Sequence, residues 1–398
     1  MNTVKNRIIT ISGEPVSGKG TVSKILIQKL LEQGYKPENI HFESTGEEFR
    51  KYFNSVVELI INFENEKRGE ILQREEIKKL FSTDQGRKVL SKTMAQLMAK
   101  KVELSNFSIE DANNAKEFDE VRNIVDSLID EKIRKQGETI NQEPHPDEVW
   151  VIDSRLAFFN IPEAFSVRLT SNAKVAGERL FNDKTRGKED SRYSSVEEAI
   201  EEREERRNGE NIRYKEKYGV DLTDDSNYDL VIDTSYSSPE SIADVVLQCE
   251  ERQQEGKGFA KKWASPKIFL PLQGEMDTIR EATYTLEELE DRIKKNGYDP
   301  ESSIEVISVD GVKYIIEGHH RNFAAAHAGK QLIPYEVIAQ DDEKIPYYGG
   351  IARDRAKYAN IGNLYGHEWI IDNNFSYSEV YPERVKEMKE EYEKDIEK

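Results

Sequence analysis

The sequence predicts an α/β protein in which a parallel sheet with flanking helices is followed by a smaller α+β domain. Short β-branched strands alternate with helical periodicity through the first 250 residues, which is typical of a parallel sheet whose ligand lies at the carboxyl ends of its strands. The first of these strands ends at a glycine-rich loop that opens a helix. After residue 265 a compact set of strands and helices follows a change in composition, which indicates a second domain.

The strands of the first part are short apolar runs that end at polar or glycine residues, and they span residues 7–12, 149–152, 164–169 and 228–234. A helix is predicted from about Thr21 to Gln33. Apolar residues at three- and four-residue spacings predict several more helices between Glu47 and Arg134. A last helix opens at Ser238-Pro239-Glu240, because proline favours the first position of a helix.

The composition changes between about Glu250 and Ser265, where glutamine, lysine, glycine and glutamate replace any apolar periodicity. Beyond this stretch we expect strands at residues 267–270, 305–308, 313–316 and 332–338, and helices at 285–295 and 322–328. The sequence therefore predicts domains at residues 1–250 and 266–345, a linker at 251–265, and a largely helical extension at 346–398. A fragment that starts near Ser265 is expected to fold alone.

Charge and cysteine content exclude several classes of protein. The 398 residues include 58 Lys and Arg against 77 Asp and Glu, and a net charge of -19 repels a nucleic-acid backbone. The single cysteine, Cys249, cannot form an internal disulfide or a cysteine-rich zinc site. No stretch is apolar for the roughly 18 residues that a membrane span needs. We therefore expect a cytoplasmic protein that binds small-molecule substrates and neither nucleic acid nor a membrane; the oligomeric state stays open.

The loop Gly13–Thr21, with sequence GEPVSGKGT, follows a strand and opens a helix, as a phosphate-binding P-loop does. Its glycines let several backbone N–H groups point at one phosphate, and the helix dipole favours an anion there. Lys19 supplies a mobile positive charge, and Thr21 supplies a hydroxyl ligand for Mg²⁺. An ordinary glycine-rich turn is the alternative. The sequence predicts ATP binding, with these nucleotide-binding residues: Gly13, Ser17, Gly18, Lys19, Gly20 and Thr21.

The Gly-Lys-Gly-Thr form of the loop resembles the nucleoside monophosphate kinases, although Val16 stands where they have glycine. Further segments resemble the cytidylate kinase-like family in its archaeal-type form, over roughly residues 7–248: STGEEFR at 44–50, VIDSRL at 151–156, RY at 213–214 and YDLVIDTS at 228–235. The resemblance implies a Mg²⁺-dependent kinase that uses ATP. The stretch between Phe53 and Asn106 carries little resemblance to a compact cytidylate kinase, so the acceptor stays open.

Phosphoryl transfer depends on positioning and on neutralising charge, so cationic side chains should gather at such a site. The segment around Arg206 and Arg213 resembles the family's segment in which two arginines seven residues apart frame an acidic residue. On a helix the two share a face and can clamp the phosphates of donor and acceptor together; a solvated charged face is the alternative. Asp153, at a strand end, would orient Mg²⁺ or its water. Arg50 and Arg155 are similar to the family's acceptor-phosphate arginines, with an ion pair at a domain edge as the alternative.

A second anion site is predicted at residues 317–321, EGHHR, where a glycine, two histidines and an arginine precede a helix. With the Asp-Gly turn before it and the alanine-rich helix after it, this segment resembles the ParB and sulfiredoxin superfamily, over roughly residues 267–340. Sulfiredoxin chemistry needs a cysteine where His319 stands, and it is therefore excluded. The branch with histidine in the loop includes free serine kinases, which phosphorylate L-serine.

This second resemblance implies that Glu317 binds a metal and that Glu275 is the general base acting on the acceptor hydroxyl. It also implies nucleotide contacts by Gly318, His319 and His320, with ADP or CTP possible in place of ATP. Arg321 would hold either the loop or the nucleotide phosphate. A zinc site at the paired histidines and a purely structural loop are the alternatives. The sequence thus predicts a phosphotransferase with two nucleotide sites; a P-loop kinase with a non-catalytic C-terminal nucleotide sensor is the competing hypothesis.

Overall fold

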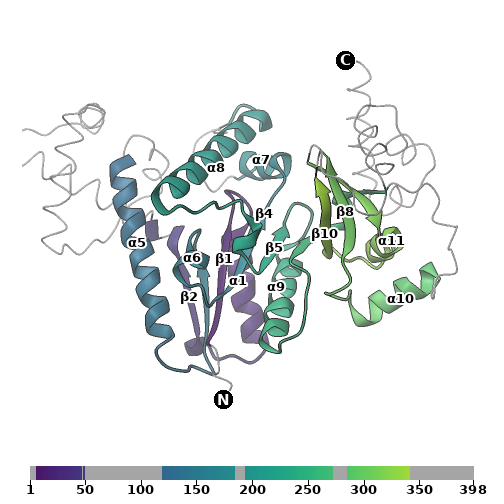
Figure 1. Ribbon diagram of the computed structural model, residues 1–398, viewed down its shortest axis with the longest axis horizontal. Helices are drawn as coiled ribbons and strands as arrows, with labels where there is room; N and C mark the ends of the chain where they lie inside the picture. Colours follow the sequence, from purple (N-terminus) through teal and green to yellow (C-terminus); the bar gives the residue numbers. More distant parts are fainter. Residues whose placement is uncertain are drawn as a thin grey trace, which may run out of the picture. The chain divides into compact units, whose positions relative to one another are not determined.

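The protein is described by a computed structural model over residues 6–46, 48–49, 119–183, 193–271, 285–309 and 311–340 (Figure 1). Arg50, Glu275 and the predicted extension at 346–398 lie outside the described residues. The chain forms two compact units. One contains the residues up to Ser12 with Leu30–Ser166 and Ala176–Asn227, and the other contains Gly13–Lys29, Val167–Val175 and the residues from Tyr228 onward.

The first unit contains a parallel sheet built from β1 (Arg7–Gly13), β2 (Ile40–Ser44) and β3 (Val149–Asp153). β3 lies between the other two strands and is parallel to both. All five residues of β3 are buried, and so are the five central residues of β1, which explains their continuous apolar runs. β2 was not predicted from the sequence. Its residues IHFES are all only partly buried, so no apolar run marks this strand.

Helices of the first unit are α5 (Asp119–Ile140), α6 (Ala157–Asn160) and α8 (Val196–Tyr218). α8 is highly charged along its length and buries few side chains. Capping groups stabilise both of its ends. The Ser195 hydroxyl accepts a hydrogen bond from the Glu198 N–H at 3.3 Å, and Gly219 closes the helix in the left-handed conformation. α7 (Ala173–Phe181) begins in the second unit, and two short 3-10 helices span Pro37–Asn39 and Asp225–Asn227.

The second unit contains α1 (Lys19–Glu32), most of β4 (Phe165–Thr170), β5 (Leu230–Asp233) and α9 (Pro239–Gln254). β5 is parallel to β4 on one side and to β6 (Lys262–Ala264) on the other. Ser238 caps α9, and its hydroxyl accepts from the Ser241 N–H at 3.2 Å, as the Ser-Pro start predicts. No helix in the described part of the chain is long and apolar enough to cross a membrane.

The structure differs from the expected linker at residues 251–265. α9 continues to Gln254, and β6 follows within the same stretch. β6 pairs in parallel with β5 and antiparallel with β10 (Ile333–Gln340), so the sheet passes without a break from the strands beside the phosphate loop to the C-terminal strands. Trp263, in β6, is only 2% exposed. Three residues are too few for a strand pattern to be read in the sequence.

The C-terminal strands continue this sheet from β10 through β8 (Ile304–Val309) and β9 (Val312–Glu317) to β7 (Phe269–Pro271). Parallel and antiparallel pairs alternate here. α10 (Leu286–Asn296) starts with a capping box, and α11 (His319–His327) packs against the 3-10 helix at Pro266–Ile268. α11 begins three residues before the predicted Asn322, so both histidines lie in its first turn. The predicted α/β class, with a mostly parallel sheet and flanking helices, is confirmed.

Candidate nucleotide sites

The glycine-rich loop leaves β1 at Gly13 and enters α1 at Lys19. Gly13 has a φ of 151°, and a Cβ atom there would lie 2.3 Å from the carbonyl oxygen of Leu169, so only glycine fits. The Glu14 N–H donates to that same carbonyl at 3.1 Å. Gly18, with a φ of 88°, turns the chain into the helix. The close approach of β4 therefore requires glycine at position 13 and anchors the start of the loop.

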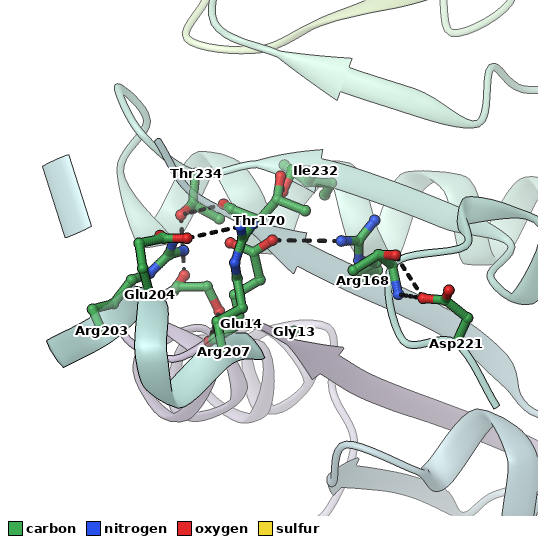
Figure 2. Close-up of polar contacts among 12 residues, drawn as sticks. Gly13, Glu14, Arg168, Thr170, Arg203, Glu204, Arg207, Asp221, Ile232 and Thr234 are labelled. Atoms are coloured by element: carbon green, nitrogen blue, oxygen red, sulfur yellow. Dashed lines mark hydrogen bonds and ion pairs between the residues drawn. The ribbon is translucent and has the colours of Figure 1, made fainter. Parts of the chain in front are cut away.

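Hydrogen bonds within the second unit hold this loop. Lys19 Nζ donates to the carbonyl oxygens of Gly13 at 2.8 Å and Glu14 at 3.0 Å. The single hydroxyl proton of Thr234, which follows β5, has two carbonyl acceptors within reach, those of Ser17 and Thr170, each 3.0 Å from Oγ1; Figure 2 shows the contact with Thr170. The Lys19 ammonium thus lies over the loop, as a lysine that contacts phosphates requires. The assignment of the nucleotide contacts themselves stays a prediction.

Val16 has a φ of 64°, in the left-handed region where a β-branched side chain is strained. This is the position at which the resembled family has glycine. The loop thus keeps the left-handed backbone conformation that glycine adopts easily, although valine occupies the position.

We expect Val16→Gly to raise the free energy of unfolding by about 0.5–1 kcal/mol, because relief of the left-handed strain exceeds the extra backbone entropy that glycine loses on folding. Urea denaturation of the two proteins measures this difference. Val16→Ala is the matched control: it removes the branched side chain but keeps a Cβ, so it should recover only part of the gain. Equal or lower stability of Val16→Gly would contradict the interpretation of strain.

A cluster of arginines and carboxylates lies in the first unit, around α8. The buried carboxylate of Glu210 pairs with the Arg155 guanidinium and with Arg206 Nε, the latter at 3.0 Å. Burial of Glu210 opposes its ionised form, but the charges of Arg155 and Arg206 outweigh this effect and hold its pKa below the ordinary value. The structure therefore brings together two of the predicted arginines on an acidic residue that the sequence analysis did not assign.

Arg213 has a different partner. Its Nε lies 3.4 Å from Asp126 of α5, and its guanidinium carbon lies 5.2 Å from the ring centre of Tyr214. One helical turn further along α5, Asp130 accepts a hydrogen bond from the Tyr218 hydroxyl at 2.6 Å. Burial raises the pKa of the Asp130 carboxyl. Arg206 and Arg213 therefore belong to two neighbouring ion-pair groups of α8 rather than to one shared pair.

Asp153 ends β3 and is 8% exposed. The hydroxyls of Ser44 and Thr45, at the end of β2, donate to its carboxylate at 3.4 Å and to its carbonyl at 3.1 Å. The Thr21 hydroxyl is on an exposed residue of α1. Both residues carry oxygen atoms of the kind that Mg²⁺ prefers, and their roles as metal ligands stay predictions. No group of three metal-binding side chains occurs among the described residues.

The second predicted site lies at the start of α11. Gly318 has a φ of 98°, and His319 behind it is 5% exposed. Burial, with a smaller effect from the His320 charge, lowers the pKa of His319 to about 4, so this ring is neutral near pH 7. Since protonation then favours the unfolded chain, the contribution of His319 to stability is present above about pH 6.5 and is lost as the pH falls toward 4.

Arg321 contacts the protein itself. Its guanidinium donates to the Ser303 carbonyl at 2.7 Å and lies 3.9 Å from Glu317, whose side chain is 61% exposed. Of the two roles predicted for Arg321, this geometry is that of a group that holds the loop. The Nε2 atom of His320 is buried and has no hydrogen-bond partner among the described residues. His320 thus provides an unsatisfied polar atom beside the first turn of α11.

Four residues that contribute to these contacts were not predicted as site residues from the sequence: Glu14, Arg168, Glu210 and Thr234. Arg168 offered a signal, because it is the one charged residue in the strand sequence FSVRLT. Glu210 offered another, as the acidic residue between two predicted arginines. Apart from Arg206, which lies four residues from Glu210, the main partners of these residues are far away in the sequence and could not be read from it.

Parts of the chain are similar to known proteins. Residues 71–236 match the cytidylate kinase-like family. The chain is 36% identical over 98 residues to a protein of Natronomonas pharaonis named cytidylate kinase, covering 24% of this chain and 47% of that protein. It is 35% identical over 124 residues to a Lacinutrix mariniflava protein named S-adenosylmethionine-dependent nucleotide dehydratase, covering 31% of this chain and 23% of that protein. The chain thus spans half or less of these curated relatives. The matches support a kinase-like N-terminal domain of the nucleotide-kinase type.

Solved structures are more distant. An uncharacterized protein from Eubacterium ventriosum has 13% identity and a TM-score of 0.32, over 62% of this chain and 99% of that one. Shikimate kinase from Bacteroides thetaiotaomicron has 12% identity and a TM-score of 0.26, over 63% of this chain and 97% of that one.

Proposed function

We propose that the chain is a Mg²⁺-dependent phosphotransferase that moves the γ-phosphoryl group of ATP to a nucleoside monophosphate or a similar small acceptor. The observation that carries this proposal is the strand, strained glycine loop and helix at residues 7–32, with the Lys19 ammonium held over the loop. The name cytidylate kinase of the Natronomonas relative supports a nucleotide acceptor.

In this proposal the loop from Gly13 to Thr21 binds the phosphates of ATP. The arginines Arg155, Arg206 and Arg213, with Arg50, bind the acceptor phosphate and neutralise charge that develops during transfer. Glu210 and Asp126 keep these cations oriented before substrate arrives. Mg²⁺ bound by Thr21 and Asp153 would neutralise the charge on the β- and γ-phosphates.

A product screen tests this function. The full chain is incubated with Mg²⁺-ATP and a panel of nucleoside monophosphates, serine and other hydroxyl compounds, and the products are identified by mass spectrometry. We expect ADP together with one nucleoside diphosphate. Binding of ATP without phosphorylation of any nucleotide in the panel would contradict the proposal.

A second nucleotide-binding function at α11 is favoured by one observation, the unsatisfied and buried Nε2 of His320 at the start of that helix. We propose that the first turn of α11 binds nucleotide phosphates, with the backbone N–H groups of the helix start and His320 as donors. Phosphorylation of L-serine in the product screen would make this site catalytic, with Glu275 as base and Glu317 as metal ligand. Nucleotide binding without such a product would make it a sensor for ATP, ADP or CTP.

We expect His320→Ala to weaken nucleotide binding at this second site roughly tenfold, because a hydrogen bond to a charged phosphate is lost. Calorimetry in a Lys19→Ala background, in which the loop site is weakened, measures that affinity. His327→Ala is the matched control, since His327 ends the same helix and lies 3.7 Å from Glu290. Equal affinity of the His320 and His327 variants would contradict the assignment.

A further inference from the structure

The glycine-rich loop carries a carboxylate of its own. The side chain of Glu14 is 11% exposed and lies 3.5 Å from a guanidinium nitrogen of Arg168, whose side chain is 9% exposed (Figure 2). Arg168 is in β4, and its guanidinium carbon lies 5.9 Å from the ring centre of Tyr228. Two nearly buried and oppositely charged side chains therefore meet directly at the predicted phosphate site.

Because Glu14 lies within the loop, its negative charge opposes the binding of an anion there. Its backbone carbonyl accepts hydrogen bonds from Lys19 Nζ at 3.0 Å and from the Ser17 hydroxyl at 2.9 Å, so the residue lies among the donors that would bind phosphate. A carboxylate turned toward these donors would compete with phosphate for them and would repel it. Contact with Arg168 keeps the Glu14 carboxylate turned toward β4 and offsets its charge.

We propose that Arg168 is a positioning residue for the nucleotide: it holds and neutralises Glu14, so that the positive field of Lys19 and the loop amides is left for the polyphosphate. The inference rests on the proposed binding of ATP by the loop. Arg168 acts through Glu14, and its loss therefore harms ATP binding only while Glu14 carries a charge.

A double-mutant cycle tests this dependence. The variants are Arg168→Met, which keeps the apolar stem without the charge, Glu14→Gln, which keeps the shape without the charge, and the combination of both. We expect Arg168→Met to raise the Kd for Mg²⁺-ATP and the KM for ATP roughly tenfold, with kcat at saturating ATP within about threefold of the unchanged protein. Glu14→Gln in the same background should return both constants to within about threefold of the original values.

A merely structural ion pair predicts a different result. The folded Arg168→Met protein would then bind ATP normally, or the double variant would bind as weakly as the single one, and either outcome overturns the inference. Thermal unfolding shows whether each variant is folded. If Arg168→Met does not fold, Arg168→Lys replaces it, because a shorter cation reaches Glu14 less well and the same rescue by Glu14→Gln is expected. Absence of ATP binding by the unchanged chain would instead reject the proposed function of the loop, and the inference with it.

Discussion

Lys19→Ala is expected to lower ATP-dependent phosphoryl transfer by roughly 10³-fold or more while the chain stays folded. The Lys19 ammonium donates to two carbonyls of its own loop, and in the proposed reaction it moves onto the β- and γ-phosphates as their charge develops. The Glu14 N–H to Leu169 carbonyl bond and the Thr234 bond to Ser17 hold the loop without it. A coupled assay for ADP, with the best acceptor from the product screen, measures the loss.

Lys24→Ala is the matched control for this prediction. Lys24 is an exposed lysine on the same helix, one turn beyond the loop, so its replacement changes the net charge by the same amount. We expect Lys24→Ala to retain activity within about twofold, since exposed charges away from a site contribute little. Full activity of Lys19→Ala would remove the basis for assigning ATP to this loop. An equal loss in both variants would point to helix stability rather than to phosphate contacts.

The fold was predictable where a strand is buried on both faces. β1, β3 and β4 are buried along nearly all of their length, and each predicted bound lies within one residue of the observed one. β2 and β6 were missed for opposite reasons. β2 is partly exposed throughout and shows no apolar run, whereas β6 is well buried but has only three residues. A strand can be recognised in the sequence only when it is buried enough to be apolar and also long enough to show a pattern.

The part of the candidate site that is formed by contiguous residues could be predicted from the sequence. Residues 13–21 are contiguous, and the strand before them and the helix after them supply the context for the motif. Ion pairs could not be predicted in the same way. Arg155 pairs with Glu210, and Arg168 pairs with Glu14, across separations of 55 and 154 residues. Only the folded chain brings these charges together, and the predicted phosphate contacts of Arg206 and Arg213 stay a prediction.

Trp263→Ala is expected to lower the free energy of unfolding by about 3–5 kcal/mol, among the largest effects of any single change in the sheet. Trp263 is 2% exposed, its indole N–H donates to the Ala260 carbonyl at 2.8 Å, and its neighbours in the sheet are Ile232 of β5 and Pro334 of β10. Alanine leaves a cavity between these strands and removes that hydrogen bond. Urea denaturation, followed by far-UV circular dichroism, measures the change.

Trp263→Phe separates the cavity from the hydrogen bond, because phenylalanine fills most of the space but cannot donate, and its expected cost is about 1–2 kcal/mol. Hydrogen exchange locates the effect. Since β6 joins β5 to β10, the amides of both neighbouring strands should exchange faster in Trp263→Ala than in the unchanged protein. Faster exchange in β5 with unchanged exchange in β10 would mean that the C-terminal strands are stable without β6, as first expected for a fragment starting near Ser265. Faster exchange in both means that such a fragment lacks the strand on which β10 depends.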